Sequence, residues 1–433
     1  MKVGLVSLGC VKNQVDAEQM LSLLLGEGYE WTADAREAEI ILVNTCGFIQ
    51  SAKEESIEAI LDMAKMKREG RCRVLCVTGC LAQRYEKELL DEIPEIDCLL
   101  GVSQYARLPE MLAQALEGGR PHDVKRQAGF LECGRVLTTP PYTAYIKIGD
   151  GCDHRCAFCA IPPIRGGYRS RPRQAILSEM RALAARGVKE QILIAQDTTR
   201  YGTDTGDSLA ALLREAAAIE GVEWLRVLYM YPDEVTDELL DTMAALPKVA
   251  PYLDLPLQHA SMRLLPRMNR RGNTKTSRRL LKKARDMGFC LRTTFIVGFP
   301  GETEQDFEEL MDFTREMAFD RMGAFTYSAE ENTPAAGFPD QVPEEVKQDR
   351  LDRLMRLQAE ISLARNCLRI GTTVKTLVTA REGDGYVGRS LLEAPDADGV
   401  IRFRSAQALA EGSFAAVRLT DADEYDLYGE VDA

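Results

Sequence analysis

The 433-residue sequence predicts an α/β protein built from three successive units. Two observations predict this fold class. Apolar strand-like runs alternate with helical stretches over most of the chain, and short strand-like runs separated by turns fill its C-terminal end. At roughly 150 residues per domain, the length suits about three domains with cores of their own. The 45% hydrophobic and 28% charged fractions exclude a fibrous repeat and a disordered chain.

The first unit, which we assign to residues 1–120, repeats a strand–helix pattern. Repeated βα units predict a parallel sheet covered by helices. A linker that contains glycine and proline, Gly118–Pro141, predicts the boundary of this domain. The expected strands are Val3–Leu8, Ile40–Asn44 and Val74–Thr78, followed by helices near Asp16–Leu25, Glu54–Lys67 and Arg84–Glu92.

A second βα series predicts an open (β/α)6 partial barrel over residues 138–368. It ends in a charged helix, about Glu344–Cys367. Short strand-like runs then predict a small β-barrel over residues 370–433, and Val374, Tyr386, Val400, Phe414 and Tyr425 lie in these runs. The six expected strands of the partial barrel are Ala144–Ile148, Gln191–Ala195, Glu223–Leu228, Tyr252–Leu255, Leu291–Val297 and Met322–Phe325.

Three cysteines, Cys152, Cys156 and Cys159, follow the first strand of the second series with the spacing C-x-x-x-C-x-x-C. Three thiolates at the carboxyl end of a barrel strand can ligate three irons of a 4Fe-4S cluster and leave the fourth iron open. An open iron can chelate S-adenosylmethionine (SAM), which the cluster then cleaves to a radical. A zinc site is the alternative, but zinc prefers four ligands and the nearest fourth candidate, His154, lies inside the turn.

A second cysteine triplet stands in the first unit, where Cys10, Cys46 and Cys80 each follow a predicted strand. The carboxyl ends of neighbouring parallel strands share one edge of the sheet, so the three thiols should converge there. Cysteines at strand ends also pack as small hydrophobic residues, but three at equivalent positions favour a second 4Fe-4S cluster.

Seven segments together resemble the radical SAM methylthiotransferases: SLGCVKNQVDAE, NTCGFIQSAKEESI, GCLAQRY, GCDHRCAFC, RGGYRSR, QDTTRYG and DLPLQH. The resemblance covers essentially the whole chain and places the six cysteines on the family's cluster ligands. It implies two 4Fe-4S clusters and SAM as cofactors, and a TRAM-like C-terminal barrel that binds substrate. One departure is Val11, where the family usually has proline after the first cysteine.

The flank Gly47-Phe48-Ile49 resembles the subgroup that methylthiolates the β-carbon of an aspartate in ribosomal protein S12. This resemblance implies ribosomal protein S12 or the small ribosomal subunit as partner, and an electron donor such as flavodoxin or ferredoxin. Relatives that methylthiolate tRNA adenosine typically carry a Ser-Ile-Arg type of sequence at this position. Transfer to tRNA is therefore the alternative activity. A non-catalytic, metal-stabilised module that binds RNA or protein is the alternative of another class.

Charge gives an independent argument about the partner. The chain has a formal net charge of −13 and a pI near 5.0, and Gly371–Ala433 holds six basic against twelve acidic residues. Such a field suits a basic protein and predicts no stable binding of nucleic acid, or else the acidic surface only keeps the protein soluble. The sequence shows neither a secretory signal nor a membrane-spanning run, so we expect a cytoplasmic protein without membrane contact and with reduced cysteines.

Weaker motifs suggest residues around SAM. Gln196 and Asp197 end the second barrel strand and are candidates to bind the methionyl or ribose part of SAM, or else they cap a solvated loop. Gly298 lies in a glycine-containing turn that either admits the adenine of SAM or is an ordinary βα turn. Gln258 and His259 face the same mouth, with His259 a candidate on the substrate side.

A basic run after the cysteine loop has two interpretations. It is a solvated surface, or it docks a carboxylate or a peptide, and the sequence does not rank its members. They are Arg165, Arg169, Arg171 and Arg173.

Overall fold

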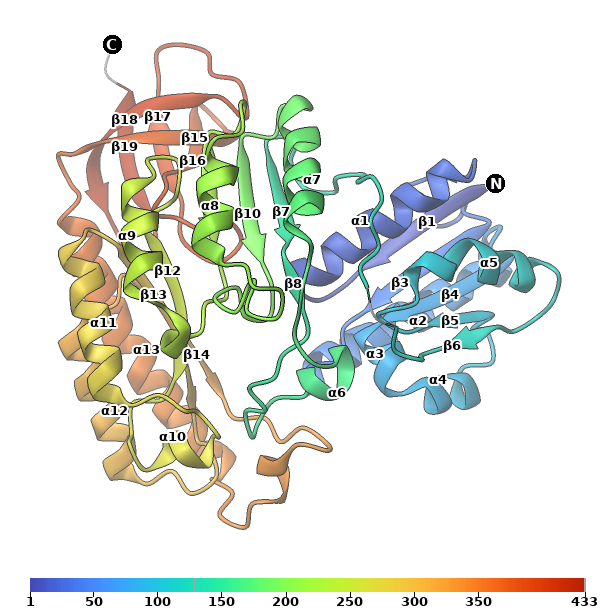
Figure 1. The fold of residues 1–433 in the computed structure, drawn as a ribbon, viewed down its shortest axis with the longest axis horizontal. Coiled ribbons are helices and arrows are strands. Elements are labelled where there is room, and N and C mark those ends of the chain that lie inside the picture. Colours follow the sequence, from blue (N-terminus) through green and yellow to red (C-terminus); the bar gives the residue numbers. More distant parts are fainter. Residues whose placement is uncertain (128, 432–433) are drawn as a thin grey trace.

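Six parallel strands form the N-terminal sheet of the computed structural model, which describes residues 1–127 and 129–431 (Figure 1). The strand order is β2-β1-β3-β4-β5-β6. Strands β3 and β4 are buried along their whole length because helices cover both faces of the sheet. The strands are β1 (Lys2–Ser7), β2 (Glu30–Trp31), β3 (Ile40–Thr45), β4 (Val74–Gly79), β5 (Cys98–Leu100) and β6 (His122–Asp123).

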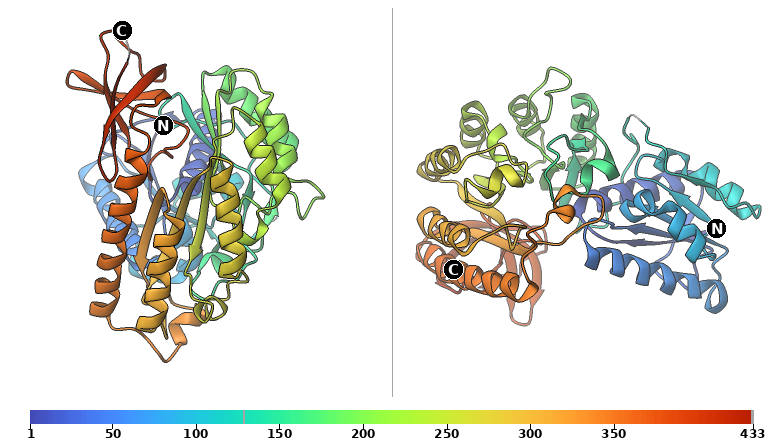
Figure 2. Two further views of the ribbon diagram at one scale, coloured as in Figure 1. Left: turned by 90° about the vertical axis from the view of Figure 1, so that its left-hand side faces the viewer. Right: turned by 90° about the horizontal axis from the view of Figure 1, so that it is seen from below.

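The helices of this unit form two layers. Helices α1 and α5 pack on one face of the sheet, and α2, α3 and α4 pack on the other (Figure 2). The expected helix at Arg84–Glu92 begins late, because the backbone leaves the helical region at Tyr85 between α3 and α4. The helices are α1 (Val11–Gly26), α2 (Gln50–Glu69), α3 (Cys80–Arg84), α4 (Glu86–Glu92) and α5 (Leu108–Leu116).

The expected linker Gly118–Pro141 is more structured than its composition suggests. Strand β6 lies inside it and extends the N-terminal sheet. Farther along, Arg135 is buried and donates from Nε to Glu18 at 3.0 Å and from a terminal nitrogen to the carbonyl of Tyr145 at 3.0 Å. The linker therefore joins the two units through buried polar contacts.

The second unit is an open arc of six parallel strands, which confirms the predicted partial barrel. Strands β11-β10-β7 and β12-β13-β14 form two three-stranded sheets, and a bridge between Leu225 and Val249 connects them. The helices of this unit lie outside the arc (Figure 2). The strands are β7 (Thr143–Lys147), β10 (Glu190–Ile194), β11 (Trp224–Val227), β12 (Tyr252–Gln258), β13 (Cys290–Val297) and β14 (Arg321–Thr326).

In the described part of this unit, six helices of nine or more residues cover the outer face of the arc, and shorter helices and strands lie at its ends. Among the described residues, no helix combines the length and apolar character needed to cross a membrane. The helices are α7 (Arg173–Ala185), α8 (Leu209–Ala217), α9 (Asp237–Ala245), α11 (Thr274–Asp286), α12 (Glu304–Met317) and α13 (Glu344–Cys367). The short elements are β8 (Gly149–Asp150), α6 (Ile161–Arg165), β9 (Arg169–Ser170) and α10 (Leu264–Arg267).

The C-terminal unit is a closed five-stranded barrel, as predicted, with the order β15-β16-β17-β19-β18. Its core includes Val378, Phe403 and Leu419. Two expected positions, Val400 and Tyr425, fall in the loops just before their strands. The strands are β15 (Thr373–Glu382), β16 (Gly385–Arg389), β17 (Ile401–Arg404), β18 (Phe414–Ala422) and β19 (Leu427–Val431).

A buried charge cluster fastens the C-terminal barrel to the partial barrel. Glu190 of β10 accepts from Arg226 Nε at 3.1 Å and pairs with Arg389 of β16. The side chains of Glu190 and Arg226 are fully buried, and that of Arg389 is 6% exposed. Two arginines thus share the carboxylate of Glu190. Loss of that carboxylate removes the negative charge that balances two buried cations.

We expect Glu190→Gln to destabilise the protein by about 3–5 kcal/mol, the usual cost of breaking a buried ion pair from one side. The melting temperature measures this loss. Glu223→Gln is the matched control, because Glu223 and its partner Lys375 are about half exposed and joined at 3.0 Å across the same pair of units. Its cost should stay below about 1 kcal/mol. Equal losses for the two variants would contradict the anchoring role of Glu190.

Candidate functional site

The first cysteine triplet lies at the carboxyl edge of three adjacent strands. Cys10 directly precedes α1, Cys46 directly follows β3, and Cys80 opens α3 after β4. The chain before Cys10 touches Cys46, since a Cβ on Gly9 would lie 2.7 Å from Cys46 Cβ and 3.0 Å from its Sγ. Glycine is also required there because φ is +88°. The structure therefore brings these strand ends together as the sequence predicts.

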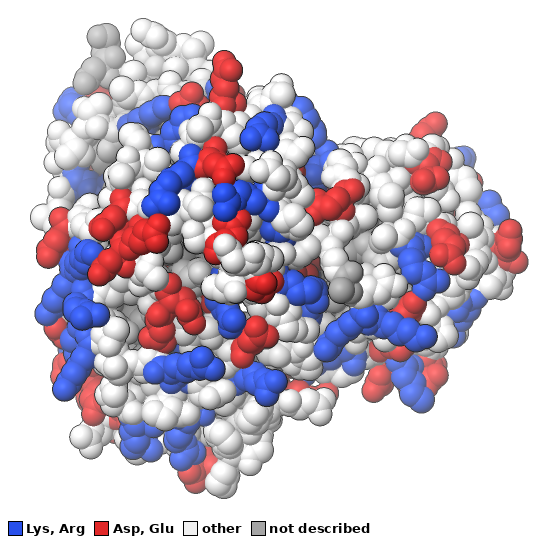
Figure 3. All heavy atoms as spheres, in the orientation of Figure 1, with Lys and Arg blue, Asp and Glu red and all other residues white. Residues whose placement is uncertain are grey.

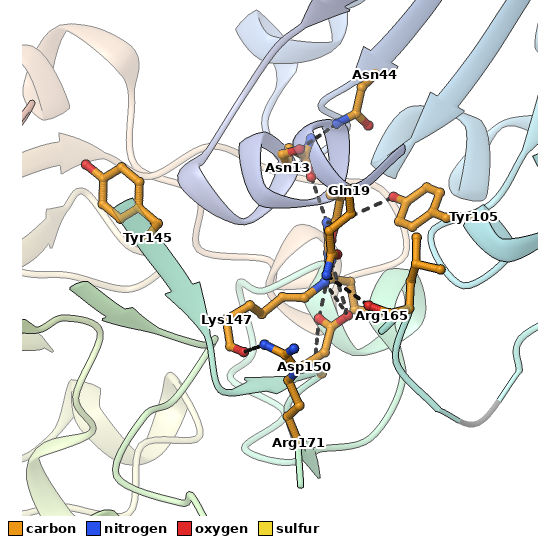
Figure 4. Close-up of polar contacts among 12 residues, drawn as sticks. Asn13, Gln19, Asn44, Tyr105, Tyr145, Lys147, Asp150, Arg165 and Arg171 are labelled. Atoms are coloured by element: carbon orange, nitrogen blue, oxygen red, sulfur yellow. Dashed lines mark hydrogen bonds and ion pairs between the residues drawn. The ribbon is translucent and has the colours of Figure 1, made fainter. Parts of the chain in front are cut away.

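Polar side chains around this triplet fix its loops (Figure 4). Asn13 donates to the carbonyl of Thr45 at 2.9 Å, and Asn44 donates to the carbonyl of Asn13 at 2.7 Å. Ser56 accepts from the Cys46 amide at 3.0 Å and donates to the Cys46 carbonyl at 2.9 Å. Sequence analysis missed these residues, although Asn13 and Asn44 lie within the motifs that carry the family resemblance.

Nearby cations lower the pKa values of the three thiols to different extents. Burial alone would raise the pKa of Cys10, but Lys12 and Arg165 outweigh it and hold that pKa below its usual value. Burial raises the pKa of Cys46, and it raises the pKa of Cys80 to about 11 although Arg165 opposes it. Cys10 and Cys46 also act on Cys80 through their charges, which places all three within electrostatic reach of one another. Thiolates are the form that binds iron, so these cations favour ligation.

The second triplet is held in the loop between β8 and α6. The Cys152 amide donates to the Gly166 carbonyl at 3.1 Å, and the Ile161 amide donates to Cys159 Sγ at 3.4 Å. Arg270 donates to Cys156 Sγ at 3.7 Å. Burial raises the pKa of Cys152 to about 11 and that of Cys159 to about 12, and the three thiols again act on one another. One hydrogen-bond donor thus reaches the sulfur of Cys159 and one reaches that of Cys156.

Within residues 1–127 and 129–431, no three or more Cys, His, Asp or Glu are gathered closely enough to hold a single metal ion. A 4Fe-4S cluster at each triplet, and zinc as the alternative at the second, stay predictions. His154, the fourth candidate for zinc, directs Nε2 to Asp197 at 2.6 Å and stacks on Tyr231 at 3.7 Å.

The predicted SAM residues have different surroundings. Asp197 is engaged by His154 and by the amide of Thr199 at 3.0 Å. Gln196 donates to Asp150 at 3.0 Å, and its buried Oε1 accepts no hydrogen bond from any described residue. That oxygen is free to meet a ligand. The structure does not test either residue as a SAM contact.

Of the three remaining mouth candidates, Gly298, Gln258 and His259, two meet Glu302. Gly298, with φ of +71°, donates its amide to Glu302 at 2.9 Å, and Lys347 packs where a side chain on Gly298 would point. His259 is buried 3.3 Å from Glu302 and accepts from the Ser261 amide at 2.9 Å. His259 thus has partners within the fold, and a substrate contact for it remains a prediction.

Two of the four arginines in the basic run, Arg165 and Arg171, are buried. At these two positions the run is neither a solvated surface nor an open docking patch. Arg171 pairs with Glu179 and with Glu132. Arg165, whose side chain is 1% exposed, donates to Asp16 at 2.9 Å and to Asp150 at 3.3 Å. Arg169 is half-buried, and Arg173 pairs with Asp207.

Arg165 joins the helix after the second triplet to the first triplet, and Figure 4 shows it among its polar neighbours. It ends α6, the helix that follows the Cys152–Cys159 loop, and reaches Cys80 Sγ at 3.9 Å and Asn13 Oδ1 at 2.7 Å. One guanidinium therefore touches a cysteine of the first triplet from the segment that carries the second. Sequence analysis included Arg165 in a basic run but gave no signal of this position.

Known families match in the same three parts of the chain. The Radical SAM superfamily matches residues 146–314, the uncharacterized protein family UPF0004 matches residues 2–101, and the TRAM domain matches residues 370–431. Among solved structures, the radical S-adenosylmethionine methyltransferase TsrM from Kitasatospora setae is similar at a TM-score of 0.58. The identity is 16%, covering 77% of this chain and 76% of that chain. At such identity the likeness shows the fold alone.

Curated relatives match over nearly the full length. The chain is 52% identical to "Ribosomal protein uS12 methylthiotransferase RimO" of Pelotomaculum thermopropionicum, covering 99% of each protein. It is 51% identical to the protein of the same name from Desulforudis audaxviator, covering 99% of this chain and 97% of that protein.

The buried carboxylate of Asp150 predicts a pH dependence. Burial disfavours its charge, but Arg165, Lys147 and Arg169 outweigh burial and lower the pKa of Asp150 to about 2. A pKa lowered by folding adds stability above the unfolded value near 3.8, and that stability is lost as the pH falls through about 2. We therefore expect Asp150→Asn to flatten the fall in melting temperature between about pH 4 and 2.

The control is Asp312→Asn, which removes a 77% exposed carboxylate paired with Arg315. It should keep the wild-type dependence on pH. An unchanged acid transition in Asp150→Asn would show that Arg165 does not stabilise the fold through this carboxylate.

Proposed function

The chain belongs to the RimO family of ribosomal protein uS12 methylthiotransferases, and we propose that its two cysteine triplets each hold a 4Fe-4S cluster for that reaction. It is a radical SAM enzyme that transfers a methylthio group. Cys152, Cys156 and Cys159 hold the cluster that supplies the electron for SAM cleavage, and Cys10, Cys46 and Cys80 hold the auxiliary cluster. The reacting atom is the β-carbon of an aspartate in uS12.

The observation that carries this proposal is the contact of Arg165, which ends the helix after the Cys152–Cys159 loop, with Cys80 of the first triplet. Transfer of a methylthio group to an unactivated carbon needs a radical generator and a sulfur site within reach of one substrate, because such a C–H bond is not acidic near neutral pH. Arg165 links the segment after Cys159 to Cys80 over 3.9 Å, so both sites face the same interface. The unpartnered Oε1 of Gln196 at the barrel mouth supports SAM binding between them.

The charge of the C-terminal barrel supports a basic protein as the macromolecular partner. Arg389 and Glu393 of this barrel are buried and paired within the fold. Because one is basic and the other acidic, leaving both out of the charge count does not change the excess of acidic residues. On the face in Figure 3, basic and acidic residues are interspersed, with no continuous basic surface for phosphates. Ribosomal proteins are basic, so electrostatic attraction favours uS12 over tRNA.

The reaction needs an external electron donor. We assign this role to a small redox protein such as flavodoxin or ferredoxin. The twelve cysteines all lie within the described residues and none of them forms a disulfide, which suits the reducing cytoplasm where ribosomal proteins are used.

Anaerobic turnover with SAM and dithionite, on purified uS12 and on tRNA in parallel, tests this function. Mass spectrometry should find one methylthio group on uS12 and none on tRNA. Cys156→Ala should abolish release of 5′-deoxyadenosine, whereas Cys46→Ala should retain some release without modifying uS12. Each variant should keep about four of the eight irons set by two four-iron clusters.

Buried Cys98 provides the matched control, because it packs in the apolar core of the same sheet. Cys98→Ala should keep both clusters and both products. Methylthioadenosine in tRNA with unmodified uS12 would overturn the substrate assignment, and modified uS12 from either cluster variant would overturn the ligand assignment.

A further inference from the structure

Lys12 is a buried cation that no carboxylate of the described residues neutralises. It lies in α1, two residues after Cys10, and is 7% exposed. Its Nζ stands 3.2 Å from the centroid of the Tyr229 ring, and within residues 1–127 and 129–431 no ion pair or hydrogen bond engages this ammonium. The aromatic face occupies one side of a group that has three donors.

Neighbouring cations at the same interface are paired. Lys147 and Arg165 both pair with Asp16, and Arg171 pairs with Glu179. Burying an unpaired ammonium is costly, and a desolvated cation–π contact offsets only part of that cost. The Cys10 thiolate attracts Lys12, but among the described residues it accepts no hydrogen bond from Nζ, so the ammonium keeps donors for an added anion.

The position of Lys12 indicates which anion. Tyr229 follows β11 at the mouth of the partial barrel, and two residues later Tyr231 stacks on His154 of the second cysteine loop. Lys12 thus stands two residues after Cys10 in α1 and contacts Tyr229, two residues before the tyrosine that stacks on the second cysteine loop. We expect a substrate that reaches both sites to pass near this ammonium.

We propose that Lys12 binds the side-chain carboxylate of the target aspartate, an inference that rests on the proposed function. The carboxylate is one bond away from the β-carbon that receives the methylthio group. An ammonium beside that carboxylate orients the reacting carbon and selects aspartate over neutral residues, because a neutral side chain leaves the ammonium unpaired. Lys12 is thus a specificity-determining residue.

SAM offers the other carboxylate that could reach this ammonium, and the two sources are separable. If Lys12 pairs with SAM, its removal weakens SAM binding whatever the protein substrate. If Lys12 pairs with the target aspartate, removing Lys12 weakens binding of uS12 only when the target residue is charged. A double-mutant cycle between enzyme and substrate isolates this difference and cancels general effects of the substitution.

The experiment uses the reconstituted holoenzyme, as wild type and as Lys12→Met, with uS12 carrying either the target aspartate or asparagine in its place. Binding of uS12 without reductant and binding of SAM are both measured. The wild type should bind the aspartate form about tenfold or more better than the asparagine form, and Lys12→Met should bind both forms alike. SAM binding should be unchanged, and Lys12→Arg should retain the preference.

Lys53→Met is the matched control for removal of a buried lysine. Lys53 is 8% exposed, lies 5.8 Å from the ring of Tyr85, and already pairs with Glu330 at 3.1 Å. Arg84 still pairs with Glu330 when Lys53 is replaced. This variant should keep the preference for the aspartate form.

Two results overturn the proposal while uS12 remains a substrate of the wild type. One is an unchanged preference for aspartate in Lys12→Met, and the other is weakened SAM binding with no coupling to the target residue. Failure of the wild type to modify uS12 overturns the proposed function, and the role of Lys12 falls with it. Turnover of the wild type thus distinguishes the two failures.

Discussion

The buried ion cluster around Arg165 is the constraint on which the arrangement of the two cysteine sites depends. Its guanidinium is enclosed between the N-terminal sheet and the partial barrel, where it meets Asp16 and Asp150 as well as Cys80 (Figure 4). Removing one member of such a cluster leaves an uncompensated buried charge, which costs about 3–5 kcal/mol. The two units are therefore held in one orientation, and a substrate meets both sites together.

The same interface explains the role of α1. Cys10 precedes the helix, Asn13 holds the loop of Cys46, and Asp16 accepts from Arg165. Val11 and Val15 pack against the residues that line the inside of the barrel arc. Helix α1 thus contributes to the first triplet, to the barrel interior and to the contact between the two units, and its Lys12 packs on the ring of Tyr229.

Much of this fold follows from local sequence patterns. The strands β1, β3 and β4 are continuous apolar runs, and parallel strands share a carboxyl edge, so the convergence of Cys10, Cys46 and Cys80 was predictable. Strands β2 and β6 have two residues each and carry no detectable period. Helix α5 was missed although LPEMLAQAL has apolar residues at helical spacing.

The polar partners could not be predicted, because they join residues far apart in the chain. Arg165 and Asp16 are 149 positions apart, and Lys12 meets Tyr229 only when α1 enters the mouth of the barrel. Asp197 was chosen for its position at a strand end, but the structure also places His154 against it. Such contacts form only when whole units dock against each other. The spacing of apolar residues along one segment does not predict that docking.

Anomalous diffraction at the iron edge from crystals of the reconstituted protein tests whether both cysteine triplets hold clusters. We expect two iron clusters, one bound by Cys10, Cys46 and Cys80 and one by Cys152, Cys156 and Cys159, with the Arg165 guanidinium between them. A single iron site, or two clusters with Arg165 turned away from both, would contradict this expectation.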